Sequence, residues 1–226
     1  MEVFSSIQGE GLLVGKRQIF IRFAGCNLNC SYCDTPESRD PSCGEELSAD
    51  QLLGMVENLV TPDFHSLSIT GGEPLLYPDF IREFLEDSPW SALLETNGSL
   101  PASARRISHF FDYASVDIKT SEHFSGDFNH NITESDISGS DDLIDREIQV
   151  INILISKGVN TYCKVVVMPT TGAEYIGALA MRLREGVDDP EKLSMVIQPC
   201  SPPEQWALYT PRLLEMSQEA GKYMDV

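Results

Sequence analysis

The chain has 226 residues, 42% of them apolar, and a formal net charge of −19 at neutral pH. This length and composition are typical of one globular α/β domain, and no run approaches the ~20 apolar residues that a membrane helix needs. The acidic excess disfavours a large footprint on nucleic-acid phosphates. The opening residues soon turn polar, unlike a signal peptide, and the clustering of the six cysteines points to a reducing compartment, so we expect a cytoplasmic location.

The first predicted strand covers residues 19–23, and three cysteines follow it with C-x3-C-x2-C spacing: Cys26, Cys30 and Cys33. Three thiolates within eight residues can hold three irons of a [4Fe–4S] cluster and leave the fourth iron open to a small molecule. Zinc sites prefer two C-x2-C pairs, and the other three cysteines of the chain do not supply a second pair. The spacing favours an iron–sulfur cluster, with a zinc knuckle as the alternative.

A helix beginning after Ser48 comes next, introduced by a capping box, and a short strand is predicted over residues 67–70. That strand ends in the turn Gly71-Gly72-Glu73-Pro74. Two glycines let a backbone approach a ligand closely, and Glu73 places a carboxylate beside it. In isolation this is an ordinary strand-to-helix turn, but its position one βα unit after the cysteine loop makes it a candidate clamp for a cationic amine.

The middle of the chain continues the alternation. Helices are predicted over residues 78–86 and 102–108, and strands over residues 93–96 and 113–119. Residues 120–141 are polar and rich in Ser, Asp and Asn, so we expect an insertion or a mobile loop there.

The last third of the chain repeats the pattern with a helix that ends at residue 157. A β-branched strand over residues 162–168, a helix over 174–184 and a strand over 195–198 follow. A C-terminal helix is predicted to open at Thr210, before a proline.

About six strands alternating with helices predict a parallel sheet with right-handed crossovers. Six units fall short of a closed eightfold barrel, so the expected fold is α/β, a partial, open TIM-like barrel with helices outside, formed by residues 1–226 as a single domain. Chemistry in such folds lies at the C-terminal strand ends. Candidate segments fall there at residues 70–73, 95–98, 117–119 and 198–199.

The cysteine loop and the Gly-Gly-Glu-Pro turn together resemble the radical S-adenosylmethionine (SAM) superfamily. In that superfamily the open iron chelates SAM, and reductive cleavage yields a 5′-deoxyadenosyl radical. Residues 4–11 (FSSIQGEG), residues 20–26 (FIRFAGC) and the pair Asp34-Thr35 narrow the resemblance to the 7-carboxy-7-deazaguanine synthase family. That resemblance implies a carbon–nitrogen lyase, which converts 6-carboxy-5,6,7,8-tetrahydropterin to 7-carboxy-7-deazaguanine with loss of ammonia. The product would serve biosynthesis of the tRNA nucleosides queuosine or archaeosine.

The resemblance also implies residue roles. Cys26, Cys30 and Cys33 would hold the [4Fe–4S] cluster, and the hydroxyl of Thr35 would bind Mg²⁺, which takes few protein ligands. The residues implied for SAM are Tyr32, Gly72, Glu73, Asn97, Ser115, Lys119 and Gln198. Those implied for the pterin are Gln8, Gly9, Glu10, Arg22 and Glu95.

Within the implied substrate pocket, Arg22 suits the 6-carboxylate because a guanidinium pairs with two oxygens at once. Glu10 or Glu95 suits the N–H donors of the aminopyrimidinone edge. The resemblance further implies a homodimer and an external flavodoxin- or ferredoxin-like electron donor, with no direct contact to nucleic acid or membrane.

Two alternatives share part of the pattern. A glycyl-radical-enzyme activase has the same cysteine spacing but acts on a protein, and it would need neither residues 4–11 nor Thr35. A non-catalytic iron–sulfur or zinc protein would need neither an open iron nor the glycine turn.

The remaining cysteines and histidines have weaker claims to a role. Cys43 is interpreted as a spare thiol, Cys163 as core and Cys200 as a neighbour of the site. The histidines show no ligand spacing, and only His123 and His130 are candidates for substrate contact.

Overall fold

The computed structural model describes residues 2–124, 140–202, 206 and 209–226. Within those ranges it forms a seven-stranded sheet whose strands follow one another in chain order. β1 (Glu2–Ile7) pairs antiparallel with β2 (Arg17–Phe23), and every later neighbour pairs parallel. The other strands are β3 (Phe64–Gly71), β4 (Ala92–Thr96), β5 (Tyr113–Ile118), β6 (Asn160–Val167) and β7 (Ser194–Pro199).

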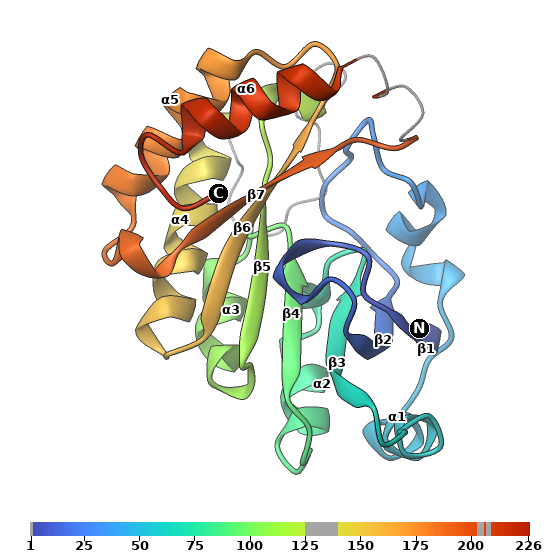
Figure 1. The fold of residues 1–226 in the computed structure, drawn as a ribbon. Helices are drawn as coiled ribbons and strands as arrows, with labels where there is room; N and C mark the ends of the chain where they lie inside the picture. The colour runs from blue at the N-terminus through green and yellow to red at the C-terminus, as the bar shows by residue number, and fades with distance from the viewer. Residues whose placement is uncertain (1, 125–139, 203–205, 207–208) are drawn as a thin grey trace.

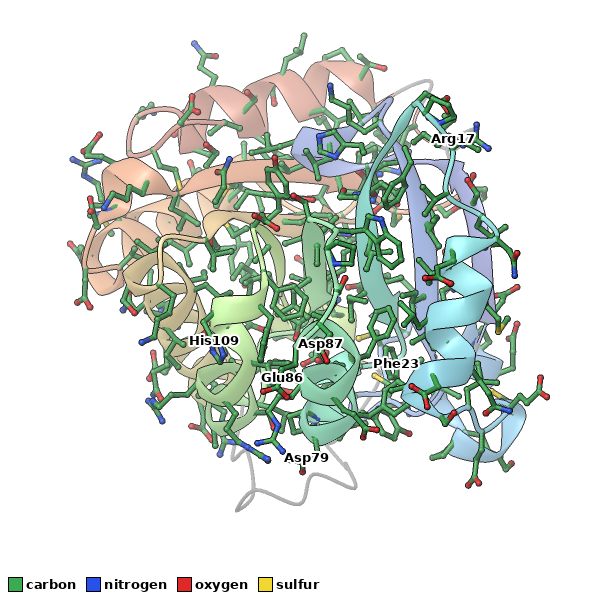
Figure 2. All side chains as sticks on the ribbon, turned by 90° about the horizontal axis from the view of Figure 1, so that it is seen from below. Arg17, Phe23, Asp79, Glu86, Asp87 and His109 are labelled. Carbon is green, nitrogen blue, oxygen red and sulfur yellow. The ribbon has the colours of Figure 1, made fainter. Side chains whose placement is uncertain are left out.

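The helices lie on the outer side of this curved sheet (Figures 1 and 2). They are α1 (Ala49–Glu57), α2 (Pro78–Leu85), α3 (Pro101–Ile107), α4 (Ser140–Ser156), α5 (Ala173–Gly186) and α6 (Thr210–Ala220). Seen from below, Asp79, Glu86 and Asp87 lie at the outer surface around α2 (Figure 2). Among the described strands, β1 and β7 are edges that do not pair with each other. The predicted open, partial barrel is confirmed.

All six predicted strands are present, but β1 was not predicted. Three of its six residues are half-buried, three are exposed and none is fully buried, so the sequence lacks the apolar run of the central strands. β1 is an edge strand reached through a hairpin, which explains both its antiparallel direction and its weak pattern.

Local signals set the helix starts. The capping box before α1 is confirmed: the Ser48 hydroxyl accepts from the backbone N–H of Gln51 at 3.2 Å, and the Gln51 side chain accepts from the N–H of Ser48 at 2.8 Å. α2, α3 and α6 each carry a proline in the first turn, where no intrahelical donor is lost.

The pleat of the strands separates an apolar face from a polar face. On β3, Leu67 and Ile69 are fully buried against the helices, whereas Ser66 and Ser68 are fully buried on the opposite, inner face. Because side chains alternate along a strand, this inner face collects the polar residues of each strand. The same alternation places Gln18 on β2 inside the barrel.

The β1–β2 hairpin loop, residues 8–16, crosses this inner face in front of β4 and β5 (Figure 1). Leu13 packs there against Leu93 and Tyr162. Gly11 adopts φ +64°, and a Cβ on it would lie 2.3 Å from the Tyr162 hydroxyl oxygen. The loop fills the inner face at this level and leaves the C-terminal strand ends open.

The expected mobile loop over residues 120–141 is described only at its two ends. Residues 121–123 form a short 3₁₀ turn and α4 begins at Ser140, while residues 125–139 lie outside the described residues.

The C-terminal residues pair beside the beginning of β7. The backbone N–H of Met195 donates to the carbonyl of Asp225 at 2.8 Å. In the described ranges, none of the helices is long and apolar enough to cross a bilayer.

Candidate functional site

A cavity of about 470 Å³ opens at the C-terminal ends of β3 to β7, facing the cysteine loop. This volume is in the range of small-molecule sites in proteins. Eleven of the predicted site residues line it: Glu10, Cys26, Cys30, Tyr32, Cys33, Thr35, Gly72, Glu95, Asn97, Lys119 and Gln198. The strand-end position predicted for the site is therefore where the cavity lies.

The cysteine loop is fixed by hydrogen bonds in which its backbone both donates and accepts. The N–H of Cys26 donates to the carbonyl of Arg39 at 3.3 Å, and the N–H of Ser31 donates to the carbonyl of His123 at 2.8 Å. The Arg39 guanidinium donates to the carbonyl of Cys30 at 2.8 Å. These bonds hold the loop against the strand ends. Arg39 also lines the cavity and was not predicted as a site residue.

The three thiols suit a cluster better than a single ion. A Zn–S bond of about 2.3 Å would bring thiolates on one zinc within about 4 Å of each other, whereas a cubane binds each thiolate at a different iron. Among the described residues, no three His, Cys, Asp or Glu side chains converge on one ion position, although Cys26, Cys30 and Cys33 line one cavity. Burial raises the pKa of Cys26 to about 11, so without a cation beside it this side chain is a neutral thiol at neutral pH.

The glycine turn lies directly against the start of the cysteine loop. Gly71 adopts φ +117°, and a Cβ on it would lie 2.3 Å from the backbone N and O of Phe23. A Cβ on Gly72 would lie 2.2 Å from the carbonyl oxygen of Gly25. Since no side chain fits at either position, the two glycines allow β3 to place its end beside Cys26 at the cavity wall.

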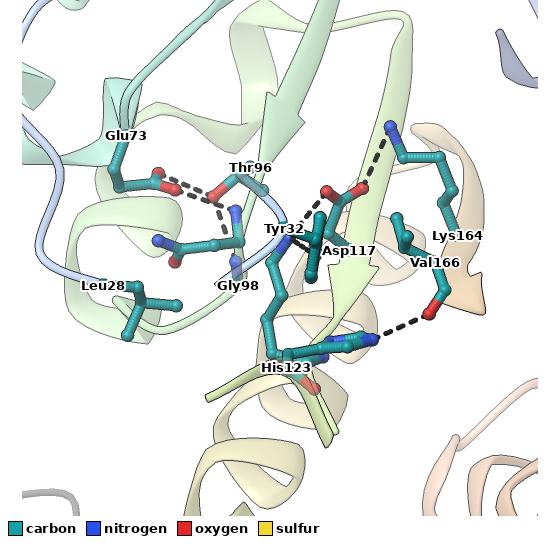
Figure 3. A network of polar contacts seen from close by, with 12 residues as sticks. Leu28, Tyr32, Glu73, Thr96, Gly98, Asp117, His123, Lys164 and Val166 are labelled. Carbon is teal, nitrogen blue, oxygen red and sulfur yellow. Dashed lines mark hydrogen bonds and ion pairs between the residues drawn. The ribbon is translucent and has the colours of Figure 1, made fainter. Parts of the chain in front are cut away.

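Glu73 lies behind the cavity wall and is fully buried (Figure 3). Its carboxylate accepts from the Thr96 hydroxyl at 2.7 Å and from the backbone N–H groups of Asn97 and Leu75 at 2.8 and 2.9 Å. Burial raises its pKa to about 7, partly offset by those donors. The contacts show Glu73 holding the end of β4 and so the cavity residue Asn97; its contact with a SAM amino group stays a prediction.

Four other predicted residues do not line the cavity. Ser115 is buried on β5, and Gly9 is exposed in the hairpin loop. Gln8 is buried, and its amide donates to Gln18 at 3.0 Å and to the Glu95 carboxylate at 3.2 Å, so it supports Glu95 from behind. Arg22 pairs with Glu2 at 3.2 Å beside the β1 edge. Their direct ligand contacts stay predictions.

Four charged side chains that line the cavity form a chain of ion pairs, in which Lys119, Asp117 and Lys164 are mostly buried and Glu10 is exposed. Figure 3 shows Asp117 between Tyr32 and Lys164. The Lys119 ammonium lies 2.9 Å from the Asp117 carboxylate and 2.8 Å from the Tyr32 hydroxyl. The Lys164 ammonium lies 3.3 Å from the other Asp117 oxygen and 2.8 Å from the Glu10 carboxylate. Burial alone would raise the pKa of Asp117, but the two lysines lower it below its usual value.

Asp117 belongs to the candidate segment 117–119 but was given no role from the sequence, and Lys164 was not singled out. The missed signal is that Lys164 is the single charged residue in a strand rich in β-branched residues. It lies two residues from Tyr162, and side chains two apart on a strand share a face, so both lie on the inner face. Although burial opposes its charge, Asp117 and Glu10 raise the pKa of Lys164 above its usual value, so the cavity keeps two permanent cations.

His123 is buried and does not line the cavity, contrary to its candidacy for substrate contact. Its Nε2 donates to the carbonyl of Val166 at 2.7 Å, and its Nδ1 accepts from the N–H of Thr120 at 3.0 Å. The ring contacts Tyr32 edge-on, with 4.7 Å between centroids. Burial, and then Lys119, lower its pKa to about 4, so it is a neutral structural bridge. His130 lies outside the described residues.

Two oxygen groups follow the last cysteine at the cavity wall. The Thr35 hydroxyl donates to the Asp34 carboxylate at 3.2 Å, and both residues line the cavity. Hard oxygen donors with open space beside them suit Mg²⁺.

The three cysteines outside the triplet lie in different surroundings. Cys163 is confirmed as core, Cys43 is exposed, and Cys200 lines the cavity.

Comparison with known proteins gives consistent matches. The family model for the radical SAM superfamily matches residues 20–183. A 7-carboxy-7-deazaguanine synthase of Methanothermobacter thermautotrophicus is 77% identical over 226 residues, covering 100% of this chain and 92% of the relative. The enzyme of the same name from Methanocaldococcus jannaschii is 35% identical over 239 residues, covering 99% and 92%. The crystal structure of QueE from Escherichia coli has a TM-score of 0.55 at 20% identity, covers 92% of this chain and 87% of its own, and shows the same fold.

Proposed function

Because the chain belongs to the 7-carboxy-7-deazaguanine synthase family of the radical SAM superfamily, we propose that its cavity converts 6-carboxy-5,6,7,8-tetrahydropterin to 7-carboxy-7-deazaguanine with loss of ammonia. One observation carries the proposal: the cysteine triplet and the glycine turn meet at a single cavity, in a chain 77% identical over its whole length to a synthase of that name. The product would enter deazapurine biosynthesis for modified tRNA.

The superfamily uses a [4Fe–4S] cluster and SAM, which together supply one-electron hydrogen abstraction. In this chain Cys26, Cys30 and Cys33 would hold the cluster. Gly72 and Asn97, at the ends of β3 and β4, lie on the cavity wall where the methionine part of SAM would rest. Tyr32, Lys119 and Gln198 would complete the SAM site, with Glu73 and Ser115 behind them.

The substrate end of the cavity carries two carboxylates, Glu10 and Glu95. Glu95 is held by the Ser68 hydroxyl at 2.6 Å and by Gln8, and a rigid acceptor suits the N–H donors of an aminopyrimidinone. Gly9 would let the backbone of the hairpin loop approach the ligand. Arg22 would release Glu2 and turn to the 6-carboxylate, since its present partner is an exposed side chain.

Mg²⁺ would bind at Thr35, with Asp34 beside it and substrate oxygens and waters completing its shell. A divalent cation there would neutralise the substrate carboxylate and fix its orientation. We further propose that residues 1–226 act as one radical SAM domain, in a homodimer served by an external flavodoxin- or ferredoxin-like donor. The net charge of −19 supports a small-molecule substrate over direct contact with nucleic acid.

The two alternative functions fit the site less well. A glycyl-radical-enzyme activase must admit a protein segment, whereas the hairpin loop here brings Glu10 into the cavity and Gln8 behind Glu95. A non-catalytic iron–sulfur protein needs no cavity beside its cysteines. The full-length match to a named synthase supports the synthase over both alternative functions.

The test is anaerobic reconstitution with iron and sulfide, followed by incubation with SAM, Mg²⁺, a chemical reductant and the carboxypterin. The expected product is a deazapurine lighter than the substrate by ammonia, detected by mass spectrometry. Cys30→Ala is the control and should yield neither product nor SAM cleavage. Cleavage of SAM by the unaltered enzyme, with the carboxypterin recovered unchanged, would overturn the assigned substrate.

A further inference from the structure

We propose that Lys164 is a positioning residue: it fixes the carboxylate of Glu10 at the substrate end of the cavity and thereby sets the affinity for the pterin. The inference rests on the proposed function, because it takes Glu10 as a substrate-binding group. It adds a residue from β6 to the substrate end of the cavity, where Glu10 comes from the hairpin loop and Glu95 from β4.

The contact joins residues 154 positions apart. The Lys164 ammonium lies 2.8 Å from Oε2 of Glu10, and its side chain is only 9% exposed. By comparison, Arg17 in the surface pair with Asp63 has a side chain that is 35% exposed. The Glu10 side chain, by contrast, is 48% exposed, so water is excluded from the lysine end of the contact but not from the carboxylate end.

Asp117 fixes the lysine in turn. Its Oδ1 lies 3.3 Å from the Lys164 ammonium, and its Oδ2 lies 2.9 Å from that of Lys119. If Lys164 loses its charge, Asp117 keeps Lys119 as a partner. Glu10 has no second cation: among the described residues, its carboxylate pairs only with Lys164.

The hairpin loop has other anchors that do not depend on this ion pair. Leu13 packs against Leu93 and Tyr162, and the backbone N–H of Gln8 donates to the carbonyl of Lys16 at 2.8 Å. Loss of Lys164 should therefore free the Glu10 side chain without unfolding the loop. Lys164 holds Oε2, and Oε1 accepts no hydrogen bond from the described residues, so Oε1 is the atom offered to a ligand N–H.

The test measures binding rather than turnover. The reconstituted holoenzyme with SAM but no reductant is titrated anaerobically with the carboxypterin by calorimetry, for Lys164→Met, Glu10→Gln and the double variant. Each single variant is expected to raise Kd on the order of tenfold, since each removes an ordered, charged acceptor for the ligand N–H, and a hydrogen bond to a charged group contributes about this factor in affinity or more. The double variant should bind within about twofold of the weaker single variant, because both act through one group.

Two further variants separate positioning from folding. Lys192→Met removes a lysine from an exposed ion pair with Asp189 and should leave Kd unchanged. Lys164→Arg keeps the charge and should lose less affinity than Lys164→Met with an intact cluster spectrum. If Lys164→Met fails to hold its cluster, the uncharged Lys164→Gln takes its place in the cycle.

The outcomes are distinct. If Lys164→Met lowers affinity by the same factor with or without Glu10, the lysine does not act through Glu10 and the inference is overturned. If Glu10→Gln binds the pterin normally, the inference also fails, while product formation by the unaltered enzyme would leave the proposed function standing. In steady-state assays the inference predicts a raised KM with a smaller change in kcat.

Discussion

At the scale of single residues, burial decides which groups near the cavity carry charge. His123 is neutral because its surroundings exclude water and Lys119 repels a second cation, while hydrogen bonds occupy both ring nitrogens. Its pKa falls to about 4, below the ordinary value of 6.5. The folded state therefore binds fewer protons than the unfolded state between pH 6.5 and 4, and stability falls as the pH is lowered through that window.

His123→Phe should remove this pH dependence, because phenylalanine does not titrate. The unaltered protein should lose on the order of 3 kcal/mol more stability than the variant between pH 7 and pH 4, from a shift of about 2.5 pH units. Denaturant unfolding of both proteins across that range measures the difference. Parallel stability curves would show that His123 titrates normally in the fold.

Thr35 carries a prediction of its own at this scale. Thr35→Val removes the hydroxyl but keeps the shape, so turnover should fall by on the order of tenfold or more and lose its dependence on added Mg²⁺. Thr61→Val is the control, because the Thr61 hydroxyl donates to Asp63 in an exposed contact away from the cavity, and it should leave turnover and its dependence on Mg²⁺ unchanged. An unchanged response of Thr35→Val to Mg²⁺ would place the cation elsewhere.

At the scale of elements, the ends of the strands are set by backbone contacts that only glycine permits. Gly71→Ala places a methyl group 2.3 Å from the backbone of Phe23, at φ +117°. The strain and overlap should cost about 3 kcal/mol or more and reduce cluster incorporation. Thermal unfolding and the iron content of the reconstituted protein measure both effects.

Gly54→Ala is the matched control on α1. Its added methyl group meets no atom within 4 Å, and a helix interior favours alanine over glycine. This variant should gain about 0.5 to 1 kcal/mol. A loss of stability in Gly54→Ala equal to that in Gly71→Ala would show that the contacts of Gly71 are not the cause.

Most elements were predictable because their signals are local. The run of β-branched residues in β6 and the capping box of α1 specify structure within a few residues. β1 was missed because an edge strand needs no apolar run. Lys164 was missed for a different reason: its partners Glu10 and Asp117 lie far away in sequence, and only the folded hairpin loop brings Glu10 to it.

The same distinction separates the predicted site residues. The cysteine spacing and the glycine turn are short motifs, so the residues that each motif brings together are close in the sequence. All three cysteines and Gly72 line the cavity. Glu73 sits two residues from the cavity residue Gly71, yet its carboxylate turns inward to Thr96 and Asn97. The direction of a side chain depends on neighbouring strands, which a motif does not contain.

At the scale of the whole molecule, the sheet order brings the chemistry together. Because β2 to β7 run parallel and in sequence, their C-terminal ends meet at one edge, and the cysteine loop after β2 closes over it. The hairpin loop fills the inner face below and supplies Glu10. The proposed chemistry of this open barrel thus depends on three cysteines that leave one iron position for SAM.

The most direct measurement is electron paramagnetic resonance of the reduced, reconstituted cluster before and after addition of SAM. An iron that Cys26, Cys30 and Cys33 leave open should bind SAM, so the spectrum of the reduced cluster should change on its addition. A spectrum that stays the same at saturating SAM, from a fully loaded protein, would mean that the protein itself fills the fourth position and would contradict the account.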